Sequence, residues 1–344
     1  MSSEVKNVVV QRNTKASRVS AVVFVPVILV LLSVPHWGSR GMISMLIEFF
    51  FYLGVSQMWN LLGGYGGLVS IGQHAYIGLG GYMLFLLTIV LNIHPLLAIL
   101  GAGVICAIIS IPVAGLVFRL QGAYQAIGTW VIAEVFELIF YKVTILGGGS
   151  GKSLPVPVAE AVNIPPIGRD GVLYLAALIL CALVNFGAYL ILCSRGGLAV
   201  KAVRDNEGAA RSCGIDNVRL KLVLFVASAL GTGLLGAVIY LDEFYISPTA
   251  AFDINWTCYM IFIVVIGGIG TLEGPIIGTI VFFVLRQYLS DLGSWYLIIL
   301  GMLAIVIMLK MPEGIWGTIC DRFDIHIFPT RRRLVFGKGE GVEV

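Results

Sequence analysis

Apolar stretches of about twenty residues follow one another along the chain, separated by short polar segments. A helix needs roughly 20 consecutive apolar residues to cross a bilayer, whereas a helix of a soluble protein has one polar face. The 344 residues are 58% hydrophobic and only 12% charged, against about 25% charged in soluble domains. The sequence therefore predicts an all-α polytopic membrane protein with about ten transmembrane helices, at residues 19–35, 41–62, 68–92, 95–118, 122–146, 171–193, 222–242, 253–270, 275–290 and 294–310.

Lysine and arginine are distributed unevenly among the segments that connect these stretches. The N-terminal segment, the loop 194–221 and the C-terminal segment are basic, whereas the loop 147–170 carries two basic and two acidic residues. Because an excess of Lys and Arg marks the cytoplasmic side, ten spans place all three basic segments there. We expect cytoplasmic N and C termini and three parts: a cytoplasmic segment 1–18, a transmembrane domain 19–310 that includes the loop 194–221, and a basic cytoplasmic tail 311–344.

Two glycine-rich segments interrupt the helical pattern, one in each half of the chain: residues 63–74, named break 1, and residues 267–275, named break 2. Glycine weakens a helix by roughly 1 kcal/mol relative to alanine. An interrupted backbone survives in hydrocarbon only when protein or a water-filled cavity surrounds it.

Paired interruptions in the two halves are typical of a transport pathway, although close helix packing also uses glycine. The polar residues of break 1 favour the pathway, so we expect broken or re-entrant helices to line it. The residues selected for this path are Gly66, Ser70, Gly72, Gln73, His74, Gly78, Gly267, Gly268, Gly270 and Gly274.

One motif suggests a nucleotide site at first sight. Residues 147–153 read GGGSGKS, but a phosphate-binding loop requires a glycine where Leu146 stands, and Pro155 prevents a helix from following at once. No other such loop is present in the sequence, so any ATP that drives transport must bind to another chain.

Two acidic residues lie inside the fifth stretch and share a helix face, because Glu134 and Glu137 are three residues apart. They are compatible with a cation or proton relay, or with pairing to Lys142 or water at the outer end of the span. His74 stands without residues that would complete a metal site. We therefore expect no catalytic residue, no metal and no cofactor in this chain, and no nucleic acid among its partners.

The basic loop 194–221 has a helical periodicity of its own. Small residues recur at spacings of three and four between Ala199 and Cys213, and charged residues occupy the remaining positions. A solvated linker needs no such pattern, so we expect one short helix whose small-residue face docks a partner, with Gly214 at its C-terminal cap. The residues selected for this contact are Ala202, Arg204, Asn206, Glu207, Ala209, Ala210 and Gly214.

Several motifs occur in a characteristic order, beginning with YGGLVSIGQHAYIGLGGY at 65–82 and including RDNEGAA at 204–210. The other motifs occupy residues 119–129, 147–155, 245–248 and 267–275, and together they cover about residues 40–312. This arrangement resembles the permease subunits of branched-chain amino-acid ABC importers, and in particular the larger of the two permeases that such importers use.

The resemblance implies a transport subunit rather than an enzyme, located in a bacterial inner membrane. Importers of this family combine two homologous permeases, two cytoplasmic ATPase subunits that bind ATP, and an external binding protein that delivers the cargo. The resemblance implies that residues 195–216 form the coupling helix received by the ATPase. Branched-chain or related amino acids are the expected cargo; a permease for urea or short amides and a secondary transporter of small polar solutes are the alternatives.

Overall fold

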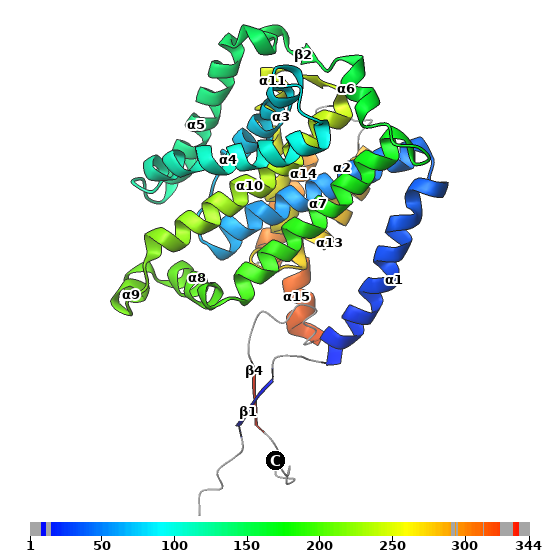
Figure 1. Ribbon diagram of the computed structural model, residues 1–344. Coiled ribbons are helices and arrows are strands. Elements are labelled where there is room, and N and C mark those ends of the chain that lie inside the picture. The colour runs from blue at the N-terminus through cyan, green and yellow to red at the C-terminus, as the bar shows by residue number, and fades with distance from the viewer. Residues whose placement is uncertain are drawn as a thin grey trace, which may run out of the picture.

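The computed structural model describes residues 8–11, 15–289, 293, 295–311, 313–323 and 333–336. Of the predicted terminal segments, residues 1–7, 12–14, 312, 324–332 and 337–344 therefore lie outside the described part. The described chain is a bundle of α-helices with very little sheet, as Figure 1 shows. The predicted all-α polytopic fold is confirmed.

A helix forms within each of the ten predicted apolar stretches. Seven helices of the described chain are long and apolar enough to cross a membrane, and the apolar parts of α1, α3 and α13 are shorter. The helices are α1 (Lys15–Trp37), α2 (Arg40–Trp59), α3 (His74–Ile89), α4 (Pro95–Val117), α5 (Ala123–Lys142), α7 (Gly168–Cys193), α10 (Asn217–Glu243), α12 (Asn255–Gly267), α13 (Gly274–Leu289) and α14 (Trp295–Lys310).

Shorter elements connect these helices. A π-helix, η1 (Asn60–Tyr65), extends α2, and two 3₁₀ turns, η2 (Thr144–Leu146) and η3 (Gly148–Ser150), follow α5. Strands β1 (Val8–Gln11) and β4 (Arg333–Phe336) pair antiparallel, as do β2 (Lys152–Ser153) and β3 (Tyr245–Ile246). The remaining short helices are α6 (Val156–Ala161), α8 (Arg195–Asp205), α9 (Glu207–Ser212), α11 (Pro248–Ala251) and α15 (Gly314–Phe323).

Helix α10 lies at the centre of the bundle and packs against α2, α3, α4 and α7. Its close approach to α3 depends on glycine at both surfaces. A Cβ on Gly80 would collide with the carbonyl oxygen of Gly233, so any larger residue there would push the helices apart. Small residues at helix interfaces let backbones approach in this way, and dispersion attraction between the closely packed atoms then stabilises helix association in a membrane.

The connecting segments divide between the two ends of the bundle. Figure 1 shows α8, α9, α15 and the β1–β4 pair toward one end, and α6, α11 and β2 at the opposite end. The basic loop and the described parts of the two terminal regions thus share one end, and the nearly neutral loop 147–170 lies at the other, as the ten-span arrangement requires. The assignment of the basic end to the cytoplasm stays a prediction.

Candidate functional site

Break 1 lies between the π-helix η1 and the start of α3. Helical geometry continues through Gly63 and Gly64, which belong to η1, and the backbone leaves it after Gly66. Gly67 has a φ of +67°, a conformation that L side chains rarely adopt, and helix resumes at His74. The predicted interruption is confirmed but begins later than the first glycines, because a π-helical turn accommodates them; such turns occur frequently at functional sites.

Side chains of α2 and α5 satisfy the exposed backbone in the middle of break 1. The indole Nε1 of Trp59 donates to the carbonyl oxygen of Ser70 over 2.8 Å. The hydroxyl of Thr129 accepts from the backbone N–H groups of Ile71 and Gly72 at 3.1 and 3.2 Å. A Cβ on Gly72 would collide with the carbonyl oxygen of Thr129, so this position admits glycine alone.

Helices α10 and α12 hold the end of break 1 through Gln73 and His74, both fully buried. The Gln73 amide donates to the hydroxyls of Ser228 and Thr232 at 2.7 and 2.9 Å. The Thr257 hydroxyl accepts from the His74 backbone N–H at 3.1 Å and lies 2.9 Å from its ring Nδ1. Oε1 of Gln73 and Nε2 of His74 have no hydrogen-bond partner among the described residues, so these two selected residues retain polar atoms for a further contact.

Break 2 lies between the end of α12 at Gly267 and the start of α13 at Gly274. Gly268 and Gly270 have φ values of +134° and +74°. The Thr271 hydroxyl closes the turn locally, because it donates to the carbonyl oxygen of Gly268 at 2.8 Å and accepts from the Gly274 N–H at 3.0 Å. The second predicted interruption is thus confirmed.

The first residue of α15 lies directly against break 2. A Cβ on Gly314 would lie 2.6 Å from the backbone nitrogen of Gly268. The sequence predicted only a basic tail in this region and missed the helix. Gly78, by contrast, lies inside α3, where an added Cβ would meet the ring of Phe252 at 2.6 Å; the structure places it at a packed helix contact rather than in break 1.

The two breaks meet at Asn60, the first residue of η1. Asn60 is fully buried; its Nδ2 donates to the carbonyl oxygen of Thr271 at 2.7 Å and its Oδ1 accepts from the Gly270 N–H at 2.8 Å. The Gly64 backbone is equally close, because a Cβ there would lie 2.7 Å from the Gly270 nitrogen. Sequence reasoning missed Asn60; an uncharged polar residue within a long apolar stretch is the signal that points to it.

The predicted single helix in the loop 194–221 is wrong, because the chain forms two helices, α8 and α9. At Asn206 the backbone is extended, with φ −156° and ψ 104°, and the side chain accepts from the Ala209 N–H at 3.0 Å. Asparagine is a preferred N-cap residue, and this local bond overrides the continuous periodicity. Gly214 follows α9 with a φ of +83°, as its predicted capping role requires.

The small-residue face of the loop is divided between two environments. Val203 and Ala210 are buried against the rest of the chain, whereas Ala202, Asn206 and Ala209 are exposed. The exposed members are therefore the part of the predicted docking face that a partner can reach.

The two charged residues selected on this loop both contact the chain itself. Arg204 turns inward, and its Nη1 donates to the carbonyl oxygen of Gly64 at 2.9 Å. Glu207 accepts from Nζ of Lys221 at 2.7 Å, and its backbone carbonyl accepts from Nδ2 of Asn217 at 2.8 Å. The Lys221 hydrogen bond lowers the pKa of the Glu207 carboxyl from its ordinary value of 4.5. Glu207 thus tethers α9 to α10.

A cavity of about 710 Å³ lies at this end of the bundle. It is bounded by residues 67–69 of break 1, by the segment before and at the start of α5, and by α9 with Lys221. The break and the loop therefore border one common space.

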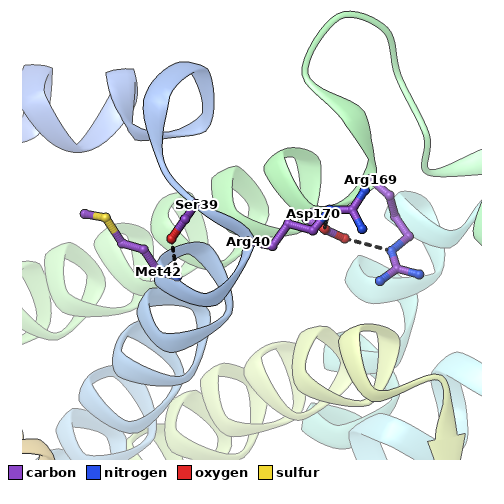
Figure 2. A network of polar contacts seen from close by, with 5 residues as sticks. All are labelled: Ser39, Arg40, Met42, Arg169 and Asp170. Carbon is purple, nitrogen blue, oxygen red and sulfur yellow. Dashed lines mark hydrogen bonds and ion pairs between the residues drawn. The ribbon is translucent and has the colours of Figure 1, made fainter.

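The opposite end carries a separate group of charges around the start of α7. Figure 2 shows Arg169 directed at Asp170, with Arg40 nearby. Nε of Arg169 lies 3.1 Å from Oδ1 of Asp170, Nε of Arg40 lies 3.8 Å from Oδ2, and the Arg169 guanidinium lies 4.5 Å from the Phe244 ring centroid. Exposed ion pairs of this kind contribute only about 0–1 kcal/mol, so the group fixes α2, α7 and the end of α10 weakly.

The motif at residues 147–153 does not adopt a phosphate-binding geometry. Lys152 and Ser153 form β2, which pairs with β3, and Nζ of Lys152 donates to the carbonyl oxygen of Ile145 at 2.9 Å. A phosphate-binding loop instead passes from a strand directly into a helix. The local geometry thus differs from that of a phosphate-binding loop, and the absence of a nucleotide site stays a prediction.

Among the intramembrane acids, Glu134 accepts a hydrogen bond from the indole Nε1 of Trp130 at 2.8 Å. The partner that the structure gives Glu134 is thus a residue one turn earlier on α5, whereas the alternatives predicted were a relay or pairing with Lys142 or water. This contact satisfies one carboxylate oxygen. A role of Glu134 and Glu137 in a cation or proton relay stays a hypothesis.

Comparison with known proteins gives one consistent result. The profile of the family described as the permease component of branched-chain amino acid transport systems matches residues 41–308. The high-affinity branched-chain amino acid transport system permease LivM of Escherichia coli is 27% identical over 322 residues, 87% of this chain and 76% of the relative. LivM of Salmonella typhimurium is 27% identical over 303 residues, 82% of this chain and 71% of the relative.

A probable branched-chain amino acid transport permease LivM of Methanocaldococcus jannaschii is 26% identical over 288 residues, 73% of this chain and 82% of the relative. No solved structure matches the chain significantly.

Proposed function

Because the chain belongs to the branched-chain amino acid transport permease family, we propose that it forms the translocation path of an ATP-driven importer for branched-chain or related amino acids. The protein is a multi-pass inner-membrane transport subunit. In the proposed assembly it pairs with a second homologous permease, two cytoplasmic ATPase subunits hydrolyse ATP, and an external binding protein delivers the cargo.

The observation that carries the proposed path is the meeting of the two breaks at Asn60. Non-helical backbone at membrane depth is tolerated only where protein or water surrounds it. Here Asn60, which precedes break 1, bonds the backbone of break 2, and the Gly64 backbone of break 1 lies against Gly270. That arrangement supports a path for a small polar solute along residues 66–74 and 267–274.

The proposed ATPase contact is the exposed side of α8 and α9. Ala202 and Ala209 leave room for a close approach, and Asn206 and Gly214 define the ends of α9. Glu207 and Arg204 contribute by anchoring the loop, since both are bonded to the transmembrane helices.

The proposed function is tested by measuring uptake and ATPase co-purification together. Deletion of this chain is expected to abolish uptake of radiolabelled leucine, isoleucine and valine; retention of all three, with loss of urea or amide uptake, would reassign the cargo. The purified chain alone is expected to hydrolyse no ATP. Uptake that persists without any ATPase partner would instead indicate a secondary transporter.

The coupling surface is tested by Ala209→Trp, with Ala209→Ser as the matched control. Overpacking a close contact costs ~1–3 kcal/mol, which corresponds to a roughly five- to hundredfold loss of the complex. Glu207→Lys is expected to weaken it further because it repels Lys221 and releases α9. Wild-type co-purification and uptake for both Ala209→Trp and Glu207→Lys would show that α9 is only a linker.

The proposed cytoplasmic position of the loop is tested by labelling. Cys213 is exposed and Cys320 is buried. With the other cysteines replaced, among them the exposed Cys258 and the buried Cys320, a membrane-impermeant maleimide is expected to label Cys213 only from the cytoplasmic side. A cysteine introduced by Ser153→Cys is expected to label only from outside, and reversal of either result would refute the ten-span orientation.

A further inference from the structure

We infer that Asn60 and Arg204 together form a clasp that joins the two breaks and links both of them to α8. Asn60 and Arg204 are positioning residues in this arrangement, because they act through the backbones of the breaks. The inference deepens the proposed function: it names the contacts through which a displacement of the coupling loop would reach both interruptions of the path at once.

The first part of the clasp is the Asn60 side chain, which bonds two adjacent backbone groups of break 2. It donates to the carbonyl oxygen of Thr271 at 2.7 Å and accepts from the N–H of Gly270 at 2.8 Å. Asn60 is fully buried and both bonds are at least partly buried, so leaving these backbone groups unsatisfied is costly. An amide supplies one donor and one acceptor in the required places, whereas aspartate lacks the donor and leucine lacks both.

The second part of the clasp is Arg204, the penultimate residue of α8. Its Nη1 donates to the carbonyl oxygen of Gly64 in break 1 at 2.9 Å. The same nitrogen lies against break 2, since a Cβ on Gly270 would be only 2.9 Å from it. The Arg204 stem also passes Gly67, where a Cβ would lie 3.2 Å from Cγ. One side chain from the loop thus contacts both breaks.

Arg204 is itself held in place on the loop. Its Nε lies 3.3 Å from Oδ1 of Asp205, and its side chain is only 35% exposed. The next residue after Asp205 is Asn206, where α8 ends and α9 begins. The junction of the two loop helices therefore lies next to the guanidinium that contacts the breaks.

Glycine is required at the meeting point for a geometric reason. A Cβ on Gly64 would collide with Oδ1 of Asn60 and would lie 2.7 Å from the Gly270 nitrogen. A Cβ on Gly270 would meet both Arg204 and the carbonyl oxygen of Gly64, the latter at 3.2 Å. The clasp closes only because the two glycine backbones face each other without side chains between them.

The clasp is tested first on the full-length permease alone, by hydrogen–deuterium exchange of peptides that cover residues 60–66 and 267–274. Arg204→Gln is expected to raise exchange at least threefold in both peptides, although it lies more than sixty residues from the second in sequence. Arg219→Gln is the matched control, because Arg219 belongs to the same region but pairs with Asp216 over 2.9 Å and is exposed. Unchanged exchange in either peptide of Arg204→Gln would overturn the inference.

The second test uses the complete transporter in proteoliposomes with its ATPase partners and loaded binding protein. Asn60→Leu is expected to lower uptake per ATP hydrolysed at least tenfold while ATP hydrolysis continues. A merely structural role would lower uptake and hydrolysis together, with loss of protein from the membrane. Arg204→Lys retains one charged donor for Gly64 and is expected to recover at least half of the uptake lost in Arg204→Gln.

The double variant Asn60→Leu/Arg204→Gln identifies whether the two residues act as one unit. We expect the uptake of the double variant to differ by less than twofold from that of the more severe single variant, because the effects of substitutions within one network are not additive. Multiplicative losses would show two independent contacts and overturn the clasp. If the wild-type assembly transports nothing, the proposed function fails, and the exchange measurement on the permease still decides the inference.

Discussion

Break 1 and break 2 interrupt the bundle with similar glycine-rich sequences, yet the rest of the protein holds them differently. Side chains from α2, α5 and α12 bond the backbone of break 1, and hydroxyls of α10 bond the Gln73 side chain. Break 2 is closed by its own Thr271, and its contacts with other segments include Asn60, Arg204 and the start of α15.

This difference indicates a division of roles between the two interruptions. A segment tied to several helices opens only when the helices separate, whereas a locally closed turn opens at a lower free energy. Break 1 is therefore expected to act as the fixed wall of the path. Break 2, with the clasp and α15 as its connections, is expected to be the part that moves during transport.

The largest expected effect is loss of transport when glycine is replaced by leucine in either break. Gly72→Leu collides with Thr129, and Gly270→Leu forces a side chain into a positive φ against Arg204. Positive φ alone costs a non-glycine residue roughly 1–2 kcal/mol. Uptake is expected to fall at least a hundredfold for both variants, measured with membrane abundance.

Gly187→Leu is the matched control for these two variants, because nothing lies within 4 Å of a Cβ at this position in α7. It is expected to transport like the wild type. Normal uptake by Gly72→Leu and Gly270→Leu would place both glycines off the path.

The next effect compares a threonine at each break. Thr129→Val leaves the N–H groups of Ile71 and Gly72 without their acceptor, and the loss at the buried Gly72 N–H alone costs about 1–3 kcal/mol. Thr271→Val removes the acceptor of the Gly274 N–H and the donor to the Gly268 carbonyl oxygen, but both bonds are only partly buried and lie within one turn. Thermal unfolding is expected at a lower temperature for Thr129→Val than for Thr271→Val. Equal shifts would remove the distinction between a fixed and a movable break.

A smaller effect is expected from loosening the contact between α15 and break 2. Gly314 has a φ of +73°, and a Cβ there would lie 2.6 Å from the Gly268 nitrogen. Gly314→Ala is expected to displace α15 at a cost of roughly 1–2 kcal/mol. Displacement of α15 exposes the buried thiol of Cys320 on this helix, and its reaction with a maleimide is expected to accelerate about five- to thirtyfold. An unchanged rate would show that α15 is anchored elsewhere.

The smallest effect concerns the anchoring of α9 by Glu207. Because Lys221 lowers the Glu207 pKa below 4.5, the pair is intact at neutral pH and is lost as the pH falls through the lowered pKa. A spin label on Cys213 is expected to keep constant mobility between pH 8 and 6 and to become more mobile below pH 4.5. Glu207→Gln is expected to raise the mobility of the label at neutral pH, because it removes an ion pair that contributes about 0.2–1 kcal/mol. A transition near neutral pH would point to another group.

Sequence reasoning predicted the helices well, because hydropathy and length are properties of local sequence. The two breaks could be predicted for the same reason, since clustered glycines weaken the helix in the segment where they occur. Asn60 and Arg204 were not assigned their contacts, because these join positions 140 or more residues apart. The division of the loop at Asn206 was missed because one capping bond outweighed a regular pattern. Helix α15 was missed because its buried face depends on contact with break 2.

The central claim, that the path runs along the breaks, is tested most directly by a cysteine at Ser70 in the assembled transporter. Ser70 is buried, and its backbone oxygen keeps the Trp59 bond in the variant. With native cysteines replaced, Ser70→Cys is expected to react with a small, charged, membrane-impermeant thiol reagent during ATP turnover and to be protected by saturating cargo. Reaction that is absent during turnover, or that is indifferent to both ATP and cargo, would contradict a path at break 1.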